Sequence, residues 1–134
     1  MSNTLFKTDS EWEKFINDIL ALDDLDEFDV EPNFKSIDVY VHKLIDESEN
    51  GDTESMFELA TFLRMTENYE LGNAYYKKAA DLGLVEAQFN YGVSMESDGN
   101  FSEAEKYFRM AIEQDFEEAK ENLAELLEKI GKTE

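Results

Sequence analysis

Among the side chains that could take part in a reaction, carboxylates are the most abundant. The chain has 134 residues, and 33 of them are Asp or Glu. Two carboxylates can act as general acid and base, but in so acidic a chain close pairs are expected by chance. Other catalytic residue types are scarce, since the chain has no cysteine and a single histidine, His42. We therefore expect no enzymatic activity, no metal site and no cofactor.

Two local candidates for a site can be judged from spacing alone. His42 falls outside the apolar stripe of its expected helix, about Ser36–Ser48, so it is predicted to be a surface residue. Asp24, Asp26 and Asp29 are wrongly spaced for a calcium loop, and their segment lacks the central glycine and terminal glutamate of such a loop.

The charge balance is the strongest compositional signal. With 33 acidic and 12 basic residues the net charge is −21. Nucleic acid and anionic membranes would be repelled, whereas a basic protein would be attracted and steered in. The alternative, that the charge only keeps the chain soluble, stays open, as does the oligomeric state.

The cellular location is inferred from what the chain lacks. No apolar run approaches the roughly 20 residues needed to cross a bilayer, and the polar residues Met1–Ser10 do not resemble a signal peptide. The absence of cysteine is compatible with a reducing compartment. A soluble, cytoplasmic protein is the expectation.

An internal repeat organises most of the chain. Shifting the sequence by 32 residues aligns aromatic, small and basic residues in register, which is typical of a helical repeat protein. The aligned sets include Ser55, Ala87 and Ala119; Leu59, Tyr91 and Leu123; and Ala60, Gly92 and Ala124. The small residues of the last set are expected to allow close approach of two helices.

Each repeat reads as two helices separated by turn signals. The expected helices are about Thr53–Thr66, Glu70–Leu82, Val85–Ser97, Ser102–Gln114 and Phe116–Ile130. Asp52 is a good N-cap for the first of them, and Ser102 with Glu105 predicts a capping box for the fourth. Gly83 and Gly131 are natural helix terminators.

The N-terminal part is less regular. An apolar stripe including Trp12, Phe15 and Ile19 predicts a helix with Thr8 and Glu11 as its capping box. This helix and the one at about Ser36–Ser48 are expected to cap the open end of the stack. The whole chain, 1–134, is predicted to be one domain: capping helices over 1–51 and repeats over 52–131.

An acidic segment, Ala21–Asn33, separates the two N-terminal helices. It contains six acids, no basic residue and the only proline, Pro32. The acids are Asp23, Asp24, Asp26, Glu27, Asp29 and Glu31. The segment could insert into a basic cleft with its interleaved apolar residues as anchors: Leu22, Leu25, Phe28 and Val30. Alternatively, it could be a solvated linker whose apolar residues fold back onto the stack, which is favoured slightly.

The stretch Ala74–Gly92, AYYKKAADLGLVEAQFNYG, resembles the Sel-like repeat family, relatives of tetratricopeptide repeats. The matching positions are Ala79, Ala80, Gly83, Ala87 and Gly92, with Tyr91 at the family's Leu position. The similarity extends over about residues 52–127 and departs in its repeat length of 32, shorter than usual. It implies an all-α fold, a short α-solenoid of stacked antiparallel helix pairs with about seven helices, and a role as adaptor or scaffold.

The resemblance also implies that the first helix of each pair lines a concave face. That face would carry Glu54, Phe57, Thr61 and Arg64; Glu86, Phe89, Val93 and Glu96; and Glu118, Glu121, Glu125 and Glu128. Carboxylates and aromatic rings together suit a Lys- or Arg-rich partner through ion pairs and cation–π contacts. In the alternative, the two Phe residues pack internally and the glutamates are merely solvated.

Two functional hypotheses remain open. In the first, the chain is an immunity or inhibitor protein that occludes a basic enzyme, such as a bacterial nuclease toxin. In the second, it is a general Sel-like adaptor that joins partners without inhibiting them. The first expects one basic protein partner, bound tightly and released by salt. The second expects several partners bound with modest affinity. A basic protein partner is the better expectation, and neither hypothesis expects nucleic acid or a membrane.

Overall fold

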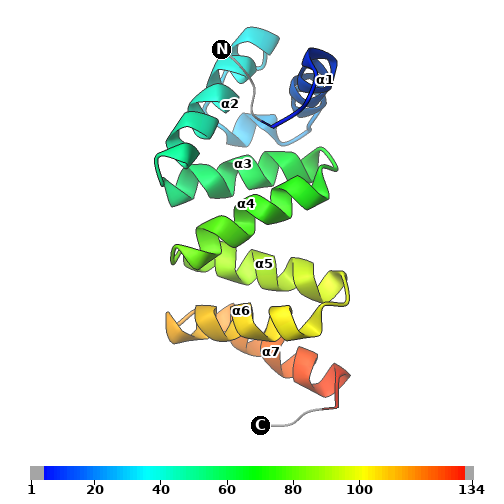
Figure 1. The fold of residues 1–134 in the computed structure, drawn as a ribbon, viewed down its shortest axis with the longest axis vertical. Coiled ribbons are helices and arrows are strands. Elements are labelled where there is room, and N and C mark those ends of the chain that lie inside the picture. The colour runs from blue at the N-terminus through cyan, green and yellow to red at the C-terminus, as the bar shows by residue number, and fades with distance from the viewer. Residues whose placement is uncertain (1–4, 132–134) are drawn as a thin grey trace. The chain divides into compact units, whose positions relative to one another are not determined.

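The computed structural model describes residues 5–131, and within that range the chain is all-α (Figure 1). It contains α1 (Asp9–Leu20), α2 (Phe34–Glu49), α3 (Thr53–Met65), α4 (Tyr69–Asp81), α5 (Val85–Ser97), α6 (Phe101–Glu113) and α7 (Glu117–Lys129), with a short 3₁₀ turn, η1 (Leu25–Glu27). Consecutive helices pack on one another, α2 on α3 and α6 on both α5 and α7. This confirms the predicted fold class and the packing expected of an α-solenoid.

The contacts divide the chain into two compact units, Met1–Gly72 and Asn73–Glu134. The division falls inside α4, whose residues belong partly to each unit. In the described range no helix is long and apolar enough to cross a membrane.

The turns reveal that the regular element of the repeat is a single helix of 13 residues. Of the residues that the structure describes, six have positive φ, and each lies sixteen positions after the one before: Gly51, Glu67, Gly83, Gly99, Asp115 and Gly131. From α3 to α7 every helix has 13 residues and starts sixteen after its predecessor. A residue with left-handed backbone ends a helix, and glycine adopts this backbone at the lowest steric cost. The spacing of these residues therefore sets the period of sixteen. The predicted period of 32 is two such elements.

The helix boundaries agree with the predicted ones to within about two residues, and one predicted cap is wrong. Asp52 caps α3 as expected, accepting a hydrogen bond from the Ser55 amide at 3.1 Å. The capping box at Ser102 does not form, because α6 starts one residue earlier and Asn100 occupies the cap without a side-chain bond. Glu105 instead accepts a hydrogen bond from Arg109 at 3.1 Å.

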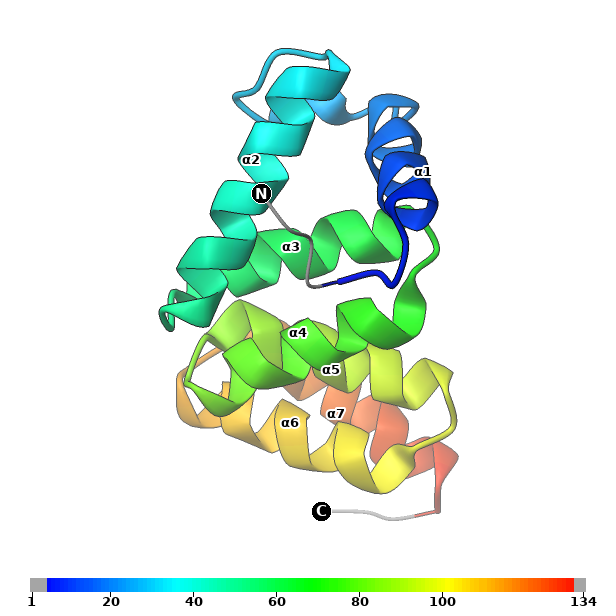
Figure 2. The same ribbon diagram turned by 45° about the horizontal axis from the view of Figure 1, so that its top comes forward.

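The first unit is built from α1 and α2 standing on α3 (Figure 2). Its core contains the side chains of all three helices, and Phe15, Ile16, Ile37 and Phe62 are almost fully buried. Thr8 caps α1 by accepting from the Glu11 amide at 3.1 Å. The Glu11 carboxylate, however, takes the Lys7 amide rather than that of Thr8, so the predicted capping box is only half formed.

The second unit packs α5, α6 and α7 in succession, and close approach depends on Gly92. A Cβ at Gly92 would lie 2.7 Å from the ring of Phe108, which is fully buried in α6. The small residue predicted here is therefore required by packing. Its repeat equivalent Ala124 is exposed, contrary to expectation, because no further helix among the described residues covers that side of α7.

Candidate partner-binding surfaces

The largest group of predicted site residues that the structure brings together lies on α5 and α7. We define the glutamate face as Glu86, Glu96, Glu118, Glu121, Glu125 and Glu128, with Phe89 and Val93 between them. The two helices are in contact. At one end the rings of Phe89 and Phe116 lie 5.1 Å apart, and at the other Lys129 pairs with Glu96 at 3.5 Å.

The charge of this face is almost unopposed. Helix α5 contains no Lys or Arg, and both cations of α7 already have carboxylate partners. Lys120 pairs with Glu117 at 3.1 Å, and Lys129 pairs with Glu96. Glu118, Glu121, Glu125 and Glu128 are exposed and form no ion pair within residues 5–131. Four carboxylates thus point outward from one side of α7.

Phe89 is only partly available to a partner. Its ring is half-buried and lies 6.0 Å from that of Phe108 in addition to its contact with Phe116. Val93 is more open, with 36% of its surface exposed. The apolar part of the glutamate face is therefore a strip between carboxylates, and Phe89 also contributes to packing within the second unit.

The predicted residues on α3 lie in the first unit. Glu54 is exposed, whereas Phe57, Thr61 and Arg64 are half-buried. Arg64 lies over Gly72 and holds its guanidinium 5.3 Å from the ring of Tyr69. That these residues form one concave face with those of α5 and α7 stays a prediction.

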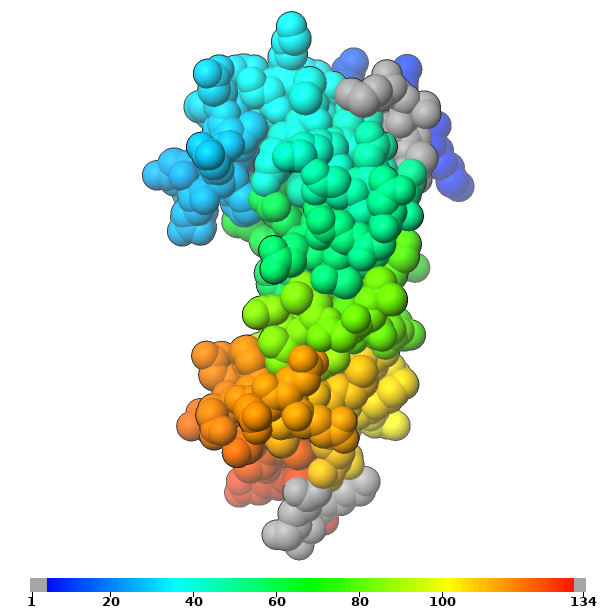
Figure 3. All heavy atoms as spheres, turned by 90° about the vertical axis from the view of Figure 1, so that its left-hand side faces the viewer, coloured from blue at the N-terminus to red at the C-terminus, as the bar shows by residue number. Residues whose placement is uncertain are grey.

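The acidic segment packs on the first unit, with its carboxylates outward. Asp23, Asp24, Asp26, Glu27, Asp29 and Glu31 are all exposed. Leu25 is buried, and the ring of Phe28 lies 4.4 Å from that of Phe62 in α3. The apolar residues thus fold back onto the helices, the alternative favoured from sequence. Figure 3 shows the segment, in light blue, projecting beside α2.

His42 is buried, so the prediction of a surface histidine was wrong. Its side of α2 faces α1, and the ring lies 4.5 Å from that of Trp12. Nδ1 donates to the Asp38 carbonyl at 2.8 Å, while Nε2 is buried without a hydrogen-bond partner in the described part of the chain. The apolar pattern of α2 could not reveal that α1 also covers the side of α2 on which His42 lies.

Sequence reasoning also missed two tyrosines that join helices. The hydroxyl of Tyr107 donates to the Asp81 carboxylate at 2.5 Å, and that of Tyr40 donates to Glu58 across α2 and α3. Burial, together with these carboxylates, raises the pKa of both phenols above the usual value. Both pairs are structural, since each connects two packed elements.

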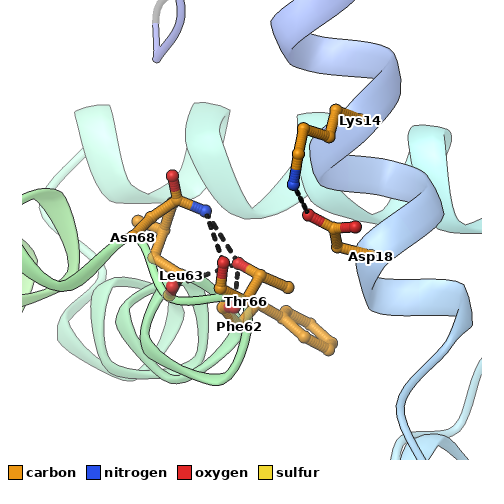
Figure 4. Close-up of polar contacts among 6 residues, drawn as sticks. All are labelled: Lys14, Asp18, Phe62, Leu63, Thr66 and Asn68. Atoms are coloured by element: carbon orange, nitrogen blue, oxygen red, sulfur yellow. Dashed lines mark hydrogen bonds and ion pairs between the residues drawn. The ribbon is translucent and has the colours of Figure 1, made fainter.

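A pocket of about 470 Å³, which we call the α1 pocket, lies between α1 and the α3–α4 turn. Phe6, Glu11, Lys14, Phe15 and Asp18 line one side, and Thr66, Glu67 and Asn68 line the other. In Figure 4, Lys14 reaches Asp18 on α1, and the Asn68 amide group turns toward Thr66. The only sequence signal for this pocket was Glu67, which stands where the later turns have Gly99 and Gly131.

Within residues 5–131 no three His, Asp or Glu side chains are close enough to hold a metal ion. No family model matches the chain. A comparison with curated proteins likewise finds no significant match.

Proposed function

We propose that this chain is a protein-interaction module that binds a basic protein partner without catalysing a reaction, and that the glutamate face is its main contact surface. The observation that carries the proposal is the row of four exposed, unpaired glutamates on α7. With Glu86 and Glu96 alongside, the face is suited to several Lys or Arg side chains at once.

Apart from Glu118, whose place in the first turn of α7 is favoured by the helix dipole, this row does not benefit the fold. Glu118, Glu121, Glu125 and Glu128 are three or four residues apart, and like charges at that spacing destabilise a helix by about 0.2–0.5 kcal/mol per pair. Glu128 also lies in the last turn of α7, where the helix dipole disfavours negative charge. Basic side chains of a partner would offset both costs, so the arrangement supports the proposed binding.

The acidic segment is proposed as a second contact. Its six exposed carboxylates, with no basic residue among them, would meet a basic surface directly. Because Leu25 and Phe28 are engaged in the first unit, the contact would be made by Asp23, Asp24, Asp26, Glu27 and Asp29 rather than by apolar anchors.

Within this function we favour an inhibitor or immunity protein that occludes a basic toxin such as a nuclease, in the cytoplasm. A nuclease cleft binds phosphates, and rows of carboxylates could occupy the same positions. The second candidate is a general adaptor of the Sel-like kind. It is supported by the resemblance of Ala74–Gly92 to that family and by the repeated 13-residue helices.

Affinity capture from the native host tests the proposal. The full chain is immobilised at an ionic strength of about 0.05 M, where surface electrostatics is weakly screened, and captured proteins are identified by mass. The proposal expects a basic protein that is released as salt is raised. Capture of acidic or neutral proteins only, insensitive to salt, would refute it. If the captured protein is a nuclease whose activity the chain blocks, the inhibitor is selected over the adaptor.

A further inference from the structure

The side chains lining the α1 pocket offer more free hydrogen-bond acceptors than free donors. The Asn68 amide nitrogen already donates to the Thr66 hydroxyl at 2.9 Å and to the Thr66 carbonyl at 3.3 Å, which leaves its oxygen as the unused group. The Thr66 hydroxyl donates to the carbonyls of Phe62 and Leu63. Lys14 donates to Asp18 at 2.6 Å. The remaining N–H groups of Lys14 are donors, but the carboxylates and the Asn68 oxygen outnumber them, so a ligand that brings donors fits best.

The charge of the pocket favours a cation. Glu11, Asp18 and Glu67 surround one cation, Lys14. The hydrogen bond and charge of Asp18 raise the pKa of Lys14, and Glu67 raises it further, so the field of Glu67 reaches across the pocket from the turn to α1. Lys14 compensates only one of the three carboxylates.

The apolar wall of the pocket suits the stem of a long basic side chain. The rings of Phe6 and Phe15 lie 5.2 Å apart, and Phe6 is partly exposed at the pocket. Lys and Arg side chains cover apolar surface with their methylene groups while their charged ends stay near polar groups. A volume of about 470 Å³ is sufficient for one such side chain.

Glu67 has a left-handed backbone conformation that favours glycine. Its φ is +67°, in a turn whose two repeat equivalents are glycine, Gly99 and Gly131. Left-handed backbone is sterically unfavourable for a non-glycine residue. A glycine would fold more easily but would place no carboxylate at the pocket.

From these observations we propose that the α1 pocket binds the side chain of an arginine or lysine of the basic partner, with Glu67 and Asp18 facing its charged end and Phe6 beside its stem. This proposal rests on the proposed function in one respect only, namely that the bound side chain belongs to the basic partner. It names an anchor on the first unit, independent of the glutamate face on the second.

A titration of the full chain with capped tripeptides tests the pocket directly. The probes are acetyl-Gly-Arg-Gly-amide, its lysine counterpart and an isosteric citrulline peptide, which keeps the shape of arginine without the charge. We expect amide NMR shifts at Lys14, Glu67 and Asn68 with the two basic peptides, with a Kd on the order of millimolar for one isolated side chain. The citrulline peptide is expected to leave these resonances in place.

Two variants complete the test. Glu67→Asn keeps a residue that tolerates left-handed backbone and removes the charge, so the Kd for the arginine peptide should rise about threefold. Glu13→Gln removes an exposed charge from α1 outside the pocket and should change the Kd by less than about 1.5-fold.

Three results would overturn the proposal: equal binding of the citrulline peptide, equal weakening by both variants, or preference for a free polyamine such as spermidine over the arginine peptide. None of these bears on the glutamate face. Failure to capture a basic partner, in turn, would refute the proposed function while leaving the peptide titration interpretable.

Discussion

The hydroxyl of Tyr107, in α6, donates a hydrogen bond to the carboxylate of Asp81, at the end of α4, across 2.5 Å. Asp81 also accepts from Lys77 at 3.1 Å, while the ring of Tyr107 is fully buried and lies 4.7 Å from that of Tyr91. The side chain of Tyr107, on α6, thus connects that helix to the end of α4 through its hydroxyl and to α5 through its ring.

Tyr107→Phe is expected to lower the free energy of unfolding by about 1 kcal/mol, because one hydrogen bond to a carboxylate is lost while ring packing is kept. The free energy of unfolding is measured by urea denaturation, with circular dichroism as the signal. Tyr69→Phe is the matched control, since Tyr69 is exposed and keeps its ring contact with Arg64. Equal effects of the two substitutions would contradict the assignment.

The Tyr107 effect should depend on pH. Burial raises the pKa of Asp81, but the hydrogen bonds from Tyr107 and Lys77 outweigh it, so the pKa of Asp81 is lowered from 3.8. A lowered folded-state pKa contributes stability that is present above the unfolded value and lost as pH falls through the folded one. The difference between wild type and Tyr107→Phe should therefore be constant between about pH 5 and about pH 9 and shrink below about pH 4. A difference that grows on acidification would be inconsistent with the bond.

Ser48 and Ser55 form a matched pair of buried hydroxyls with opposite expected effects. The Ser48 hydroxyl has no hydrogen-bond partner among residues 5–131, whereas that of Ser55 donates to Glu47 at 2.5 Å. Ser48→Ala should be neutral or stabilise by up to about 1 kcal/mol, and Ser55→Ala should destabilise by about 1 kcal/mol. Thermal unfolding at one pH compares them, and a larger loss for Ser48→Ala would contradict the account.

The residues with positive φ predict which turns can be improved. Asp115→Gly and Glu67→Gly should each stabilise the chain by about 1 kcal/mol, because glycine adopts this backbone without steric cost. Gly83→Ala, at the repeat equivalent of Asp115, should destabilise by a similar amount. Chemical denaturation of the three variants measures these changes in stability. Destabilisation by Asp115→Gly would contradict the prediction and show that the Asp115 side chain is needed at that turn.

The fold was largely predictable because its determinants are local. Gly51, Gly83 and Gly131 end helices through their own backbone freedom, and Asp52 caps α3 through the next three residues. Burial of His42 and exposure of Ala124 were not predictable, because each depends on whether another helix covers that position. The sixteen-residue period was hidden because Glu67 and Asp115 replace glycine at two of its six turns.

The candidate surfaces were predictable only in part. Positions 32 apart in the repeat occupy equivalent places on α5 and α7, and these two helices are in contact. That their residues bind a partner stays a prediction. The α1 pocket was missed because its two walls, α1 and the turn at Thr66–Asn68, are far apart in sequence and belong to no common pattern.

The central claim is that the glutamate face holds the basic partner at a cost to the stability of α7. Both the binding and the stability can be measured. Replacing Glu118, Glu121, Glu125 and Glu128 by Gln removes like-charge repulsion on α7, so the variant should unfold at slightly higher urea. The control replaces four other exposed acids, Glu13, Asp46, Glu49 and Glu113, with the corresponding amides. Both variants carry the same net charge, so any difference between them reports position rather than total charge.

The most direct test is the Kd of the captured basic partner for wild type, the α7 variant and the control, measured by calorimetry at an ionic strength of about 0.05 M and again at about 0.3 M. The account predicts that the α7 variant binds at least about tenfold more weakly than the control at low salt, with the gap narrowing at high salt. Equal affinity of the two variants would contradict the claim that this face holds the partner.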